Sequence, residues 1–118
     1  MAIADPQQLD QAFHALADSN RRAIVARLTH GAASVSELAA PLGVSLPTVL
    51  QHLDVLQRSG LVRSEKIGRV RTCRLEADPM RAVEHWIAEH RTVWERKFDR
   101  LGNVLDARFT TTKGDRNR

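Results

Sequence analysis

The hydrophobic positions of this chain recur mostly at helical spacing. Near the N-terminus, Leu9 and Phe13 are four residues apart, and they follow Asp5 and Pro6, a helix-capping residue and a first-turn proline. This pattern predicts a first helix that begins at Pro6 and ends at about Asp18.

Two more helices are predicted before residue 44. Asp18 is suited to cap the second helix, in which Ile24 and Leu28 share a face and which ends near Gly31. A third helix of about two turns follows a serine cap at Ser34 or Ser36 and ends at Gly43.

The fourth helix is capped by Ser45 and has Pro47 in its first turn, where a missing N–H costs nothing. At about 100° per residue, its predicted packing face consists of Leu46, Val49, Leu53 and Leu56. Its predicted outer face consists of Pro47, Thr48, Gln51, Asp54, Val55 and Arg58. Leu50 and His52 fall on the flanks.

After Gly60 the hydrophobic period changes from helix to strand. The segments LVRSEK and VRTCRL alternate in side-chain character and are separated by Ile67, Gly68 and Arg69, which predicts a β-hairpin. From Arg58 to Arg74 this region holds six basic residues and one acid, a net charge of +5, whereas the whole chain carries +4. Such a concentration of charge indicates a polyanionic partner, either nucleic acid or an anionic membrane surface.

A long final helix is predicted to begin at Asp78 and Pro79. Its apolar residues follow steps of three, four and seven, as in a coiled-coil seam, and are Met80, Val83, Ile87, Trp94, Phe98, Leu101 and Leu105. From Thr110 the sequence lacks an apolar anchor, so residues 110–118 are predicted to form a mobile tail. We therefore expect one folded domain over residues 1–109.

Composition narrows the class of protein. The chain has 118 residues, of which 42% are hydrophobic and 27% charged, as in an ordinary globular domain. No apolar run approaches the length of a membrane span and no secretory signal is visible, so a cytoplasmic location is expected. A chain this short is also expected to be helped by dimerisation.

Two helices joined by a tight turn and followed by a basic hairpin are typical of a winged helix-turn-helix. The short side chains on the outer face of the fourth helix suit close approach to a major groove, where Thr48 and Gln51 are predicted to read base edges. Arg58, Arg69 and Arg71 are predicted to bind phosphates. The alternative is that these polar residues form only a solvated surface and an edge that discourages strand pairing.

The segments FHALADSNRRAIVARL, SVSELAAPLGVSLPTVLQHLDVLQRSGLV and GRVRTCRL resemble the winged helix-turn-helix repressors of the ArsR family. The segment HWIAEHRTVWERKFDRLGNVL resembles the subgroup with a long, tryptophan-bearing last helix. The resemblance implies a mainly α fold with one β-hairpin wing and a long C-terminal dimerisation helix. It also implies a homodimer that binds double-stranded DNA at a palindromic operator.

The resemblance also suggests roles for individual residues. It places the DNA-binding positions at Ser45, Pro47, Thr48, Gln51, His52, Arg69 and Arg71. For His52 a second interpretation stays open, in which it is partly buried and bonded to a neighbouring helix. The first and last helices are implied to form the dimer interface, with Leu9, Phe13, Met80, Val83, Trp86, Ile87, Trp94, Phe98, Leu101 and Leu105 as its expected members.

Metal and redox sensing need separate consideration. Metal-sensing members of the family carry a cysteine pair where this chain has Ser34 and Ser36, and hydroxyl groups are poor ligands for soft metals, so no metal site or other cofactor is expected. The one cysteine, Cys73, is predicted to be a small core residue. If it is exposed, neighbouring arginines lower its pKa and make it a candidate redox switch.

No sequence motif indicates an enzyme, since there is no Gly-rich phosphate loop, no HExxH and no paired nucleophile and base. Two other functions stay open beside the repressor. One is a metal-responsive or redox-responsive sensor that also binds DNA. The other is a winged-helix adaptor that has lost DNA binding and grips a protein through Leu50 and Val55.

Overall fold

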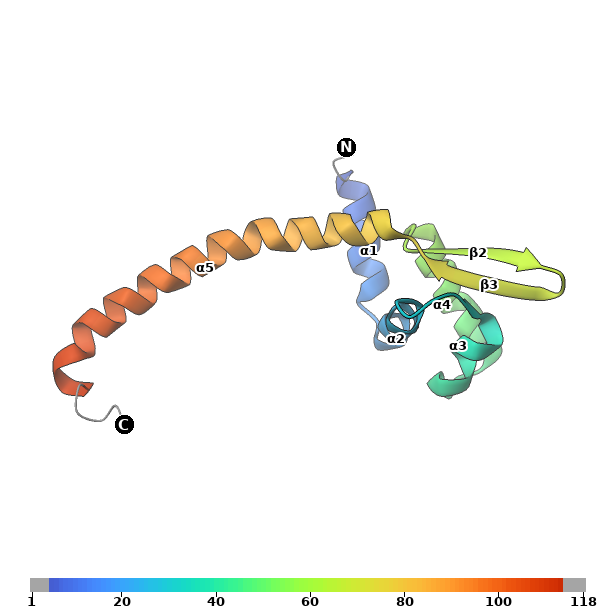
Figure 1. The fold of residues 1–118 in the computed structure, drawn as a ribbon, viewed down its shortest axis with the longest axis horizontal. Helices are drawn as coiled ribbons and strands as arrows, with labels where there is room; N and C mark the ends of the chain where they lie inside the picture. The colour runs from blue at the N-terminus through green and yellow to red at the C-terminus, as the bar shows by residue number, and fades with distance from the viewer. Residues whose placement is uncertain (1–4, 114–118) are drawn as a thin grey trace. The chain divides into compact units, whose positions relative to one another are not determined.

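The computed structural model of the chain describes residues 5–113, with side chains as far as Asp106 (Figure 1). The residues group into two compact units, one ending at Glu84 and the next beginning at His85. Within residues 5–113, no helix has both the length and the apolar composition needed to cross a bilayer.

The first two helices begin where the sequence predicts. Helix α1 (Pro6–Leu16) follows Asp5, whose side chain accepts from the Gln7 N–H at 3.2 Å. Helix α2 (Ser19–Leu28) follows Asp18, whose carboxylate accepts from the backbone N–H groups of the second and third helical residues. These bonds satisfy donors that have no partner inside the helix, which is why acidic residues mark both starts.

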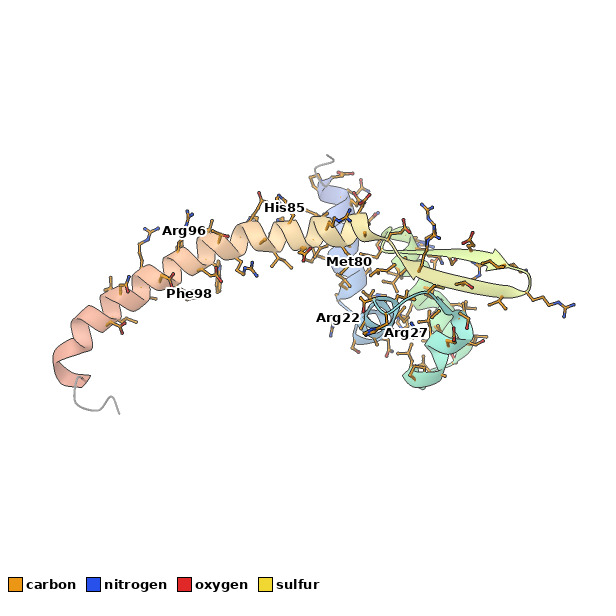
Figure 2. The ribbon with its side chains drawn as sticks, in the orientation of Figure 1. Arg22, Arg27, Met80, His85, Arg96 and Phe98 are labelled. Carbon is orange, nitrogen blue, oxygen red and sulfur yellow. The ribbon has the colours of Figure 1, made fainter. Side chains whose placement is uncertain are left out.

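Arg22 and Arg27 of α2 (Figure 2) donate hydrogen bonds to carbonyl groups at or just beyond helix ends. Arg22 donates from Nη1 to the Leu16 carbonyl at 2.9 Å, at the C-terminal end of α1. Arg27 donates from Nη1 to the Gly31 carbonyl at 3.0 Å, just beyond its own helix. Cations are favoured there because the last carbonyls of a helix lack partners and carry partial negative charge.

Helix α3 (Val35–Leu42) and helix α4 (Leu46–Arg58) form the predicted pair. Ser34 is the cap of α3: the Glu37 N–H donates to its Oγ at 3.1 Å, and its own N–H donates to the Glu37 carboxylate at 2.8 Å. The helix ends at Gly43, whose φ of 67° is the left-handed conformation that glycine adopts without strain. Ser45 then caps α4, so the turn between the helices is three residues long.

Strands β2 (Val62–Ile67) and β3 (Val70–Leu75) form the antiparallel hairpin, which has the predicted position and a shorter turn (Figure 1). Ile67 pairs with Val70, so the turn contains only Gly68 and Arg69, and Ile67 belongs to the strand. Gly68 has a φ of 66°, the positive value that the first residue of a tight hairpin turn needs.

A third strand, β1 (Ala33–Ser34), was not predicted. It pairs antiparallel with β3 and gives the sheet the order β1-β3-β2, so the hairpin is joined to the start of α3. Two residues are too few to show an alternating pattern, and only the tertiary pairing reveals the strand.

The core of the first unit lies where the four short helices meet the sheet. Its largest fully buried side chains are Ile24, Leu38, Val49, Leu53, Leu56, Leu61 and Cys73. They come from α2, α3, α4, the start of the hairpin and β3, so the core fixes the helix pair against the base of the hairpin.

Helix α5 (Ala77–Lys113) begins one residue before the predicted Asp78. Its first residues belong to the first unit, where Val83 is buried and Met80 is half-buried against the core. The helix continues through 110–113, the first part of the predicted tail, whereas residues 114–118 lie outside the described part of the chain.

Candidate nucleic-acid interface

The exposed face of α4 differs from the predicted one by a rotation about the helix axis. Val49, Leu53 and Leu56 are buried as expected. However, Leu46, predicted to pack inward, is 50% exposed, and Val55, predicted to face outward, is half-buried against the core. Leu50 is also outward, at 45% exposure.

The rotation has a structural cause. Helices α1, α2 and α3 and strand β2 all pack against α4. Val55 lies beside α1, and together they line an open groove of about 380 Å³ whose other residues are Gln7, Asp10, Gln11, His14, Arg58 and Ser59. The spacing of apolar residues along α4 does not indicate on which side of the helix α1 packs, so the sequence alone could not place Val55 inward. The exposed residues of α4 are Leu46, Pro47, Leu50, Gln51, Asp54, Gln57 and Arg58.

The hydroxyl groups at the start of α4 serve its own cap. Ser45 Oγ lies 2.8 Å from Thr48 Oγ1 and also accepts from the Thr48 N–H at 3.3 Å. Thr48 is half-buried, whereas Pro47 and Gln51 are exposed. Within residues 5–113 the Gln51 amide has no hydrogen-bond partner, so its donor and acceptor both face solvent.

His52 has the position that the second interpretation gave it. It is half-buried, and its Nδ1 lies 3.4 Å from Nη1 of Arg21 on α2. The same guanidinium donates from Nε to the Ala15 carbonyl at 2.7 Å and from Nη2 to the His14 carbonyl at 3.2 Å. Arg21 therefore connects the end of α1 to the middle of α4.

Arg58, at the end of α4, forms an ion pair of 2.9 Å with Asp54 one turn earlier. Both side chains are more than half exposed. Exposed pairs of this kind contribute little to stability, so Arg58 can exchange its carboxylate for a stronger anionic partner.

The two faces of the hairpin differ in charge. Arg63 and Arg74 lie opposite each other on one face, and both are paired with carboxylates. Arg74 lies 3.8 Å from Glu65 and 3.5 Å from Glu76, and Arg63 lies 4.0 Å from Glu76. The high charge of this region is thus partly neutralised by an acid just beyond the counted segment.

Lys66 and Arg71 lie opposite each other on the other face, together with the core residue Cys73. Within residues 5–113 neither forms an ion pair. Sequence reasoning selected Arg71 but missed Lys66. The strand register, which pairs the two, is the signal that identifies it, because residues directly opposite across a hairpin share a face.

Arg71 also takes part in a chain of hydrogen bonds that joins the hairpin to α4. Its Nη1 donates to Ser64 Oγ at 2.9 Å, and that hydroxyl donates to the Gln57 Oε1 at 2.8 Å. Arg69 lies in the exposed turn without an ion-pair partner in the described part of the chain. Among the residues whose side chains are described, the hairpin therefore presents Lys66, Arg69 and Arg71 as cations without a carboxylate partner.

Cys73 is fully buried, as predicted, at 0% exposure. Burial raises the pKa of its thiol, and the neighbouring Arg71 offsets only part of that effect. The condition for a redox switch, an exposed thiol with a lowered pKa, is therefore not met.

The possible metal ligands on α5 include one side-chain pair and a single histidine that contacts the backbone. His85 Nε2 lies 3.5 Å from a Glu89 carboxylate oxygen, and His90 Nδ1 lies 2.8 Å from the Trp86 carbonyl. Among residues 5–113, no three His, Cys, Asp or Glu side chains come together in a way that would hold a metal ion.

The residues expected at a dimer interface fall into two groups. Val83 is buried in the core of its own unit, and Leu9 and Met80 are half-buried against that core. The others have exposed side chains: Phe13, Trp86, Ile87, Trp94, Phe98, Leu101 and Leu105. Val93 and Val104, which the sequence analysis did not select, are exposed on the same helix as the last six.

Comparison with known proteins identifies the family. Residues 16–65 match a family described as a helix-turn-helix domain. The crystal structure of an ArsR family transcriptional regulator, RHA00566, has a TM-score of 0.72 and 48% sequence identity, and the match covers 80% of this chain and 97% of that chain. HTH-type transcriptional regulator Rv2034 of Mycobacterium tuberculosis is 39% identical over 98 residues, 83% of this chain and 89% of that protein. The chain belongs to the ArsR family.

This ArsR-family chain is therefore a transcriptional regulator with a winged helix-turn-helix DNA-binding fold. The fold also matches the solution structure of the homodimeric winged helix-turn-helix DNA-binding domain Mb0332 of Mycobacterium bovis. That match has a TM-score of 0.59 and 24% identity, and it covers 85% of this chain and 95% of that chain. In this fold α3 and α4 are the helix-turn-helix pair and the β2–β3 hairpin is the wing.

Proposed function

We propose that this chain is a repressor that binds a palindromic operator as a homodimer. Bases are read from the start of α4, where Pro47 and Gln51 are exposed and the free amide of Gln51 is the principal reader. Ser45 and Thr48 cap the helix beside it, and His52 positions α4 through Arg21 rather than reading a base. Phosphates are bound by Arg58, Arg69 and Arg71, to which we add Lys66.

The arrangement of Gln51 and the wing cations supports this division of roles most directly. The Gln51 amide is exposed and without a partner in the described residues, and a glutamine amide can bond both the N6 and N7 edges of adenine. The unneutralised cations Lys66, Arg69 and Arg71 lie on the hairpin that Ser64 and Gln57 join to the same helix. Base reading and phosphate binding are thus carried by two bonded elements.

The homodimer is supported by the apolar surface of α5. Between Trp86 and Leu105 its exposed apolar side chains lie within about 140° of the helix circumference. A helix gains most of its stability by burying such a face, and a second copy provides an identical one. An operator bound by two related recognition helices is then palindromic, with half-sites about one turn of DNA apart. Operator binding also requires the cytoplasm as the working compartment.

One observation favours a second function. Leu46 and Leu50 are exposed on α4, and an exposed apolar pair is also what a protein-binding adaptor presents. A gel-shift titration at low salt separates the two. Retarded DNA supports the regulator, whereas no retardation together with recovery of a stable protein complex supports the adaptor.

Two variants test the division between base and phosphate contacts. Gln51→Ala is expected to lose about 1–3 kcal/mol of discrimination between operator and random DNA, because it removes a base contact. Arg69→Ala is expected to weaken binding to both DNAs equally and to reduce the salt slope by about 0.9, the value for one phosphate contact.

The measurement is the dissociation constant of each variant for operator and random duplex across a range of salt concentrations. Lys66→Ala should behave like Arg69→Ala, while Arg63→Ala is the matched control, because Arg63 lies on the opposite face of the hairpin from Lys66 and Arg71. Equal losses on both DNAs for Gln51→Ala and Arg69→Ala would refute the division.

A further inference from the structure

The first half of α4 exposes two leucines. Leu46 is 50% exposed and Leu50 is 45% exposed, whereas Leu53 and Leu56 of the same helix are buried at 1% or less. Leu46 and Leu50 are four residues apart and therefore adjacent on one face. Leu53 and Leu56 pack in the core of the protein, whereas Leu46 and Leu50 face solvent.

Leu46 and Leu50 lie in a stretch of sequence without formal charge, which ends at Asp54, four residues after Leu50 and on the same helix face. Residues 45–53 contain no Asp, Glu, Lys or Arg. Pro47 and Gln51, each next to one of the leucines in sequence, are exposed as well. The start of α4 is thus an apolar surface with one amide, while the cations of the region lie on the wing and at the far end of the helix.

A major groove offers such a surface one apolar partner. The base edges there display hydrogen-bond donors and acceptors, and the thymine 5-methyl group is the single apolar feature. In helix-turn-helix proteins the N-terminal residues of the recognition helix are the ones that contact base edges. Exposed leucines at these positions therefore match thymine better than any other base.

We propose that Leu50, together with Leu46, determines specificity by packing against thymine 5-methyl groups in the operator. This inference rests on the proposed DNA-binding function, and it identifies some of the bases that the protein recognises in its operator. Gln51 beside Leu50 suits adenine, so the half-site combines thymines contacted by the leucines with an adenine contacted by the amide.

Replacing thymine by deoxyuridine tests this without altering any hydrogen bond, because uracil differs only by the absence of the methyl group. Operator fragments are first selected from random duplexes with the wild-type protein. Each thymine is then replaced in turn, and the dissociation constants are measured. At one or two positions per half-site, deoxyuridine is expected to weaken wild-type binding about fourfold, the effect of one buried methyl-sized group.

The Leu50→Ala variant should bind thymine and deoxyuridine equally at one of those positions, since it lacks the contacting side chain. Leu50→Met keeps an apolar side chain of similar size and should keep part of the preference. Ile67→Ala removes a residue that is 62% exposed on the wing and should leave the ratio at that position unchanged. Circular dichroism checks that the exposed substitutions leave the helices intact.

Three results would overturn the proposal. Wild-type protein that binds thymine and deoxyuridine equally at every operator position, or a ratio that Leu50→Ala leaves unchanged, removes the methyl contact while DNA binding itself stands. Wild-type protein that binds no duplex, with Leu46 and Leu50 protected in a complex with another protein, overturns both this assignment and the proposed function.

Discussion

Two carboxylates at helix starts are held by backbone N–H groups. The Ser34 N–H donates to Glu37 and keeps the pKa of that carboxyl below its ordinary value of 4.5. The Arg21 and Asn20 N–H groups hold the pKa of Asp18 below 3.8, with Arg21 making the larger contribution. Both carboxylates are therefore more stable ionised in the folded chain than in the unfolded one.

The Glu37→Gln variant should be less sensitive to acid. A carboxyl whose pKa is lowered by folding stabilises the protein fully above its unfolded pKa of about 4.5, and this contribution is lost as the pH falls through the lower folded value. Glutamine keeps the capping geometry and cannot be protonated. From about pH 6 to about pH 3, its free energy of unfolding should decrease less than that of the wild type.

Urea unfolding at each pH measures this difference. Glu95→Gln is the matched control, because Glu95 accepts no backbone hydrogen bond within the described residues, and it should follow the wild type. A Glu37→Gln curve parallel to that of the wild type would mean that the capping box contributes nothing to acid sensitivity.

Residue identity predicted local features better than tertiary ones. The caps at Asp5, Asp18 and Ser45 were predictable because a cap depends only on residues two or three positions away. The sequence allows two interpretations of His52, because its contact with Arg21 joins residues 31 positions apart in the chain. Lys66 was missed because its importance depends on the strand opposite it.

The exposed apolar side chains of α5 lie along one side of the helix, as the spacing of its apolar residues in the sequence predicts. Trp94 and Phe98 contact each other edge to face, with ring centroids 4.6 Å apart, and the rings of Trp86 and His90 are stacked with centroids 4.0 Å apart. These rings lie on the apolar stripe, whereas Arg96 projects from a different side of the helix than Phe98 (Figure 2). Residues two apart on a helix point about 200° away from each other.

Substitution on that stripe should dissociate the dimer. Phe98→Asp places a carboxylate in the proposed interface, which costs enough desolvation energy to weaken dimerisation at least about tenfold. Arg96→Asp introduces the same carboxylate on another face and should leave dimerisation unchanged. Sedimentation equilibrium measures both, and a Phe98→Asp variant that stays as dimeric as the wild type would place the interface elsewhere.

The order of the helices and the position of the hairpin were predicted correctly from the spacing of hydrophobic residues and from the capping, proline and glycine residues at helix ends and turns. The errors share one physical origin, since each depends on packing between segments distant in sequence. Strand β1 exists because it pairs with β3, and Ile67 belongs to β2 because it pairs with Val70. The rotation of the exposed face of α4 follows from where α1 covers Val55.

In the whole molecule, each region has one role in the proposed function. The first unit holds α4 against the base of the hairpin through a single core, and the Arg71–Ser64–Gln57 bonds fix the wing to that helix. In the proposed homodimer the α5 stripe is the surface that binds the second copy. Two copies related by a two-fold axis would present two copies of α4, so the proposed operator has the same symmetry.

Selection of bound fragments from random duplex DNA by the purified wild-type chain tests this claim most directly. We expect an enriched consensus with two-fold symmetry, whose half-sites lie about one helical turn apart, about 10–10.5 base pairs. Fragments enriched no further than the starting pool would contradict sequence-specific DNA binding, and an enriched but asymmetric site would contradict the paired recognition helices.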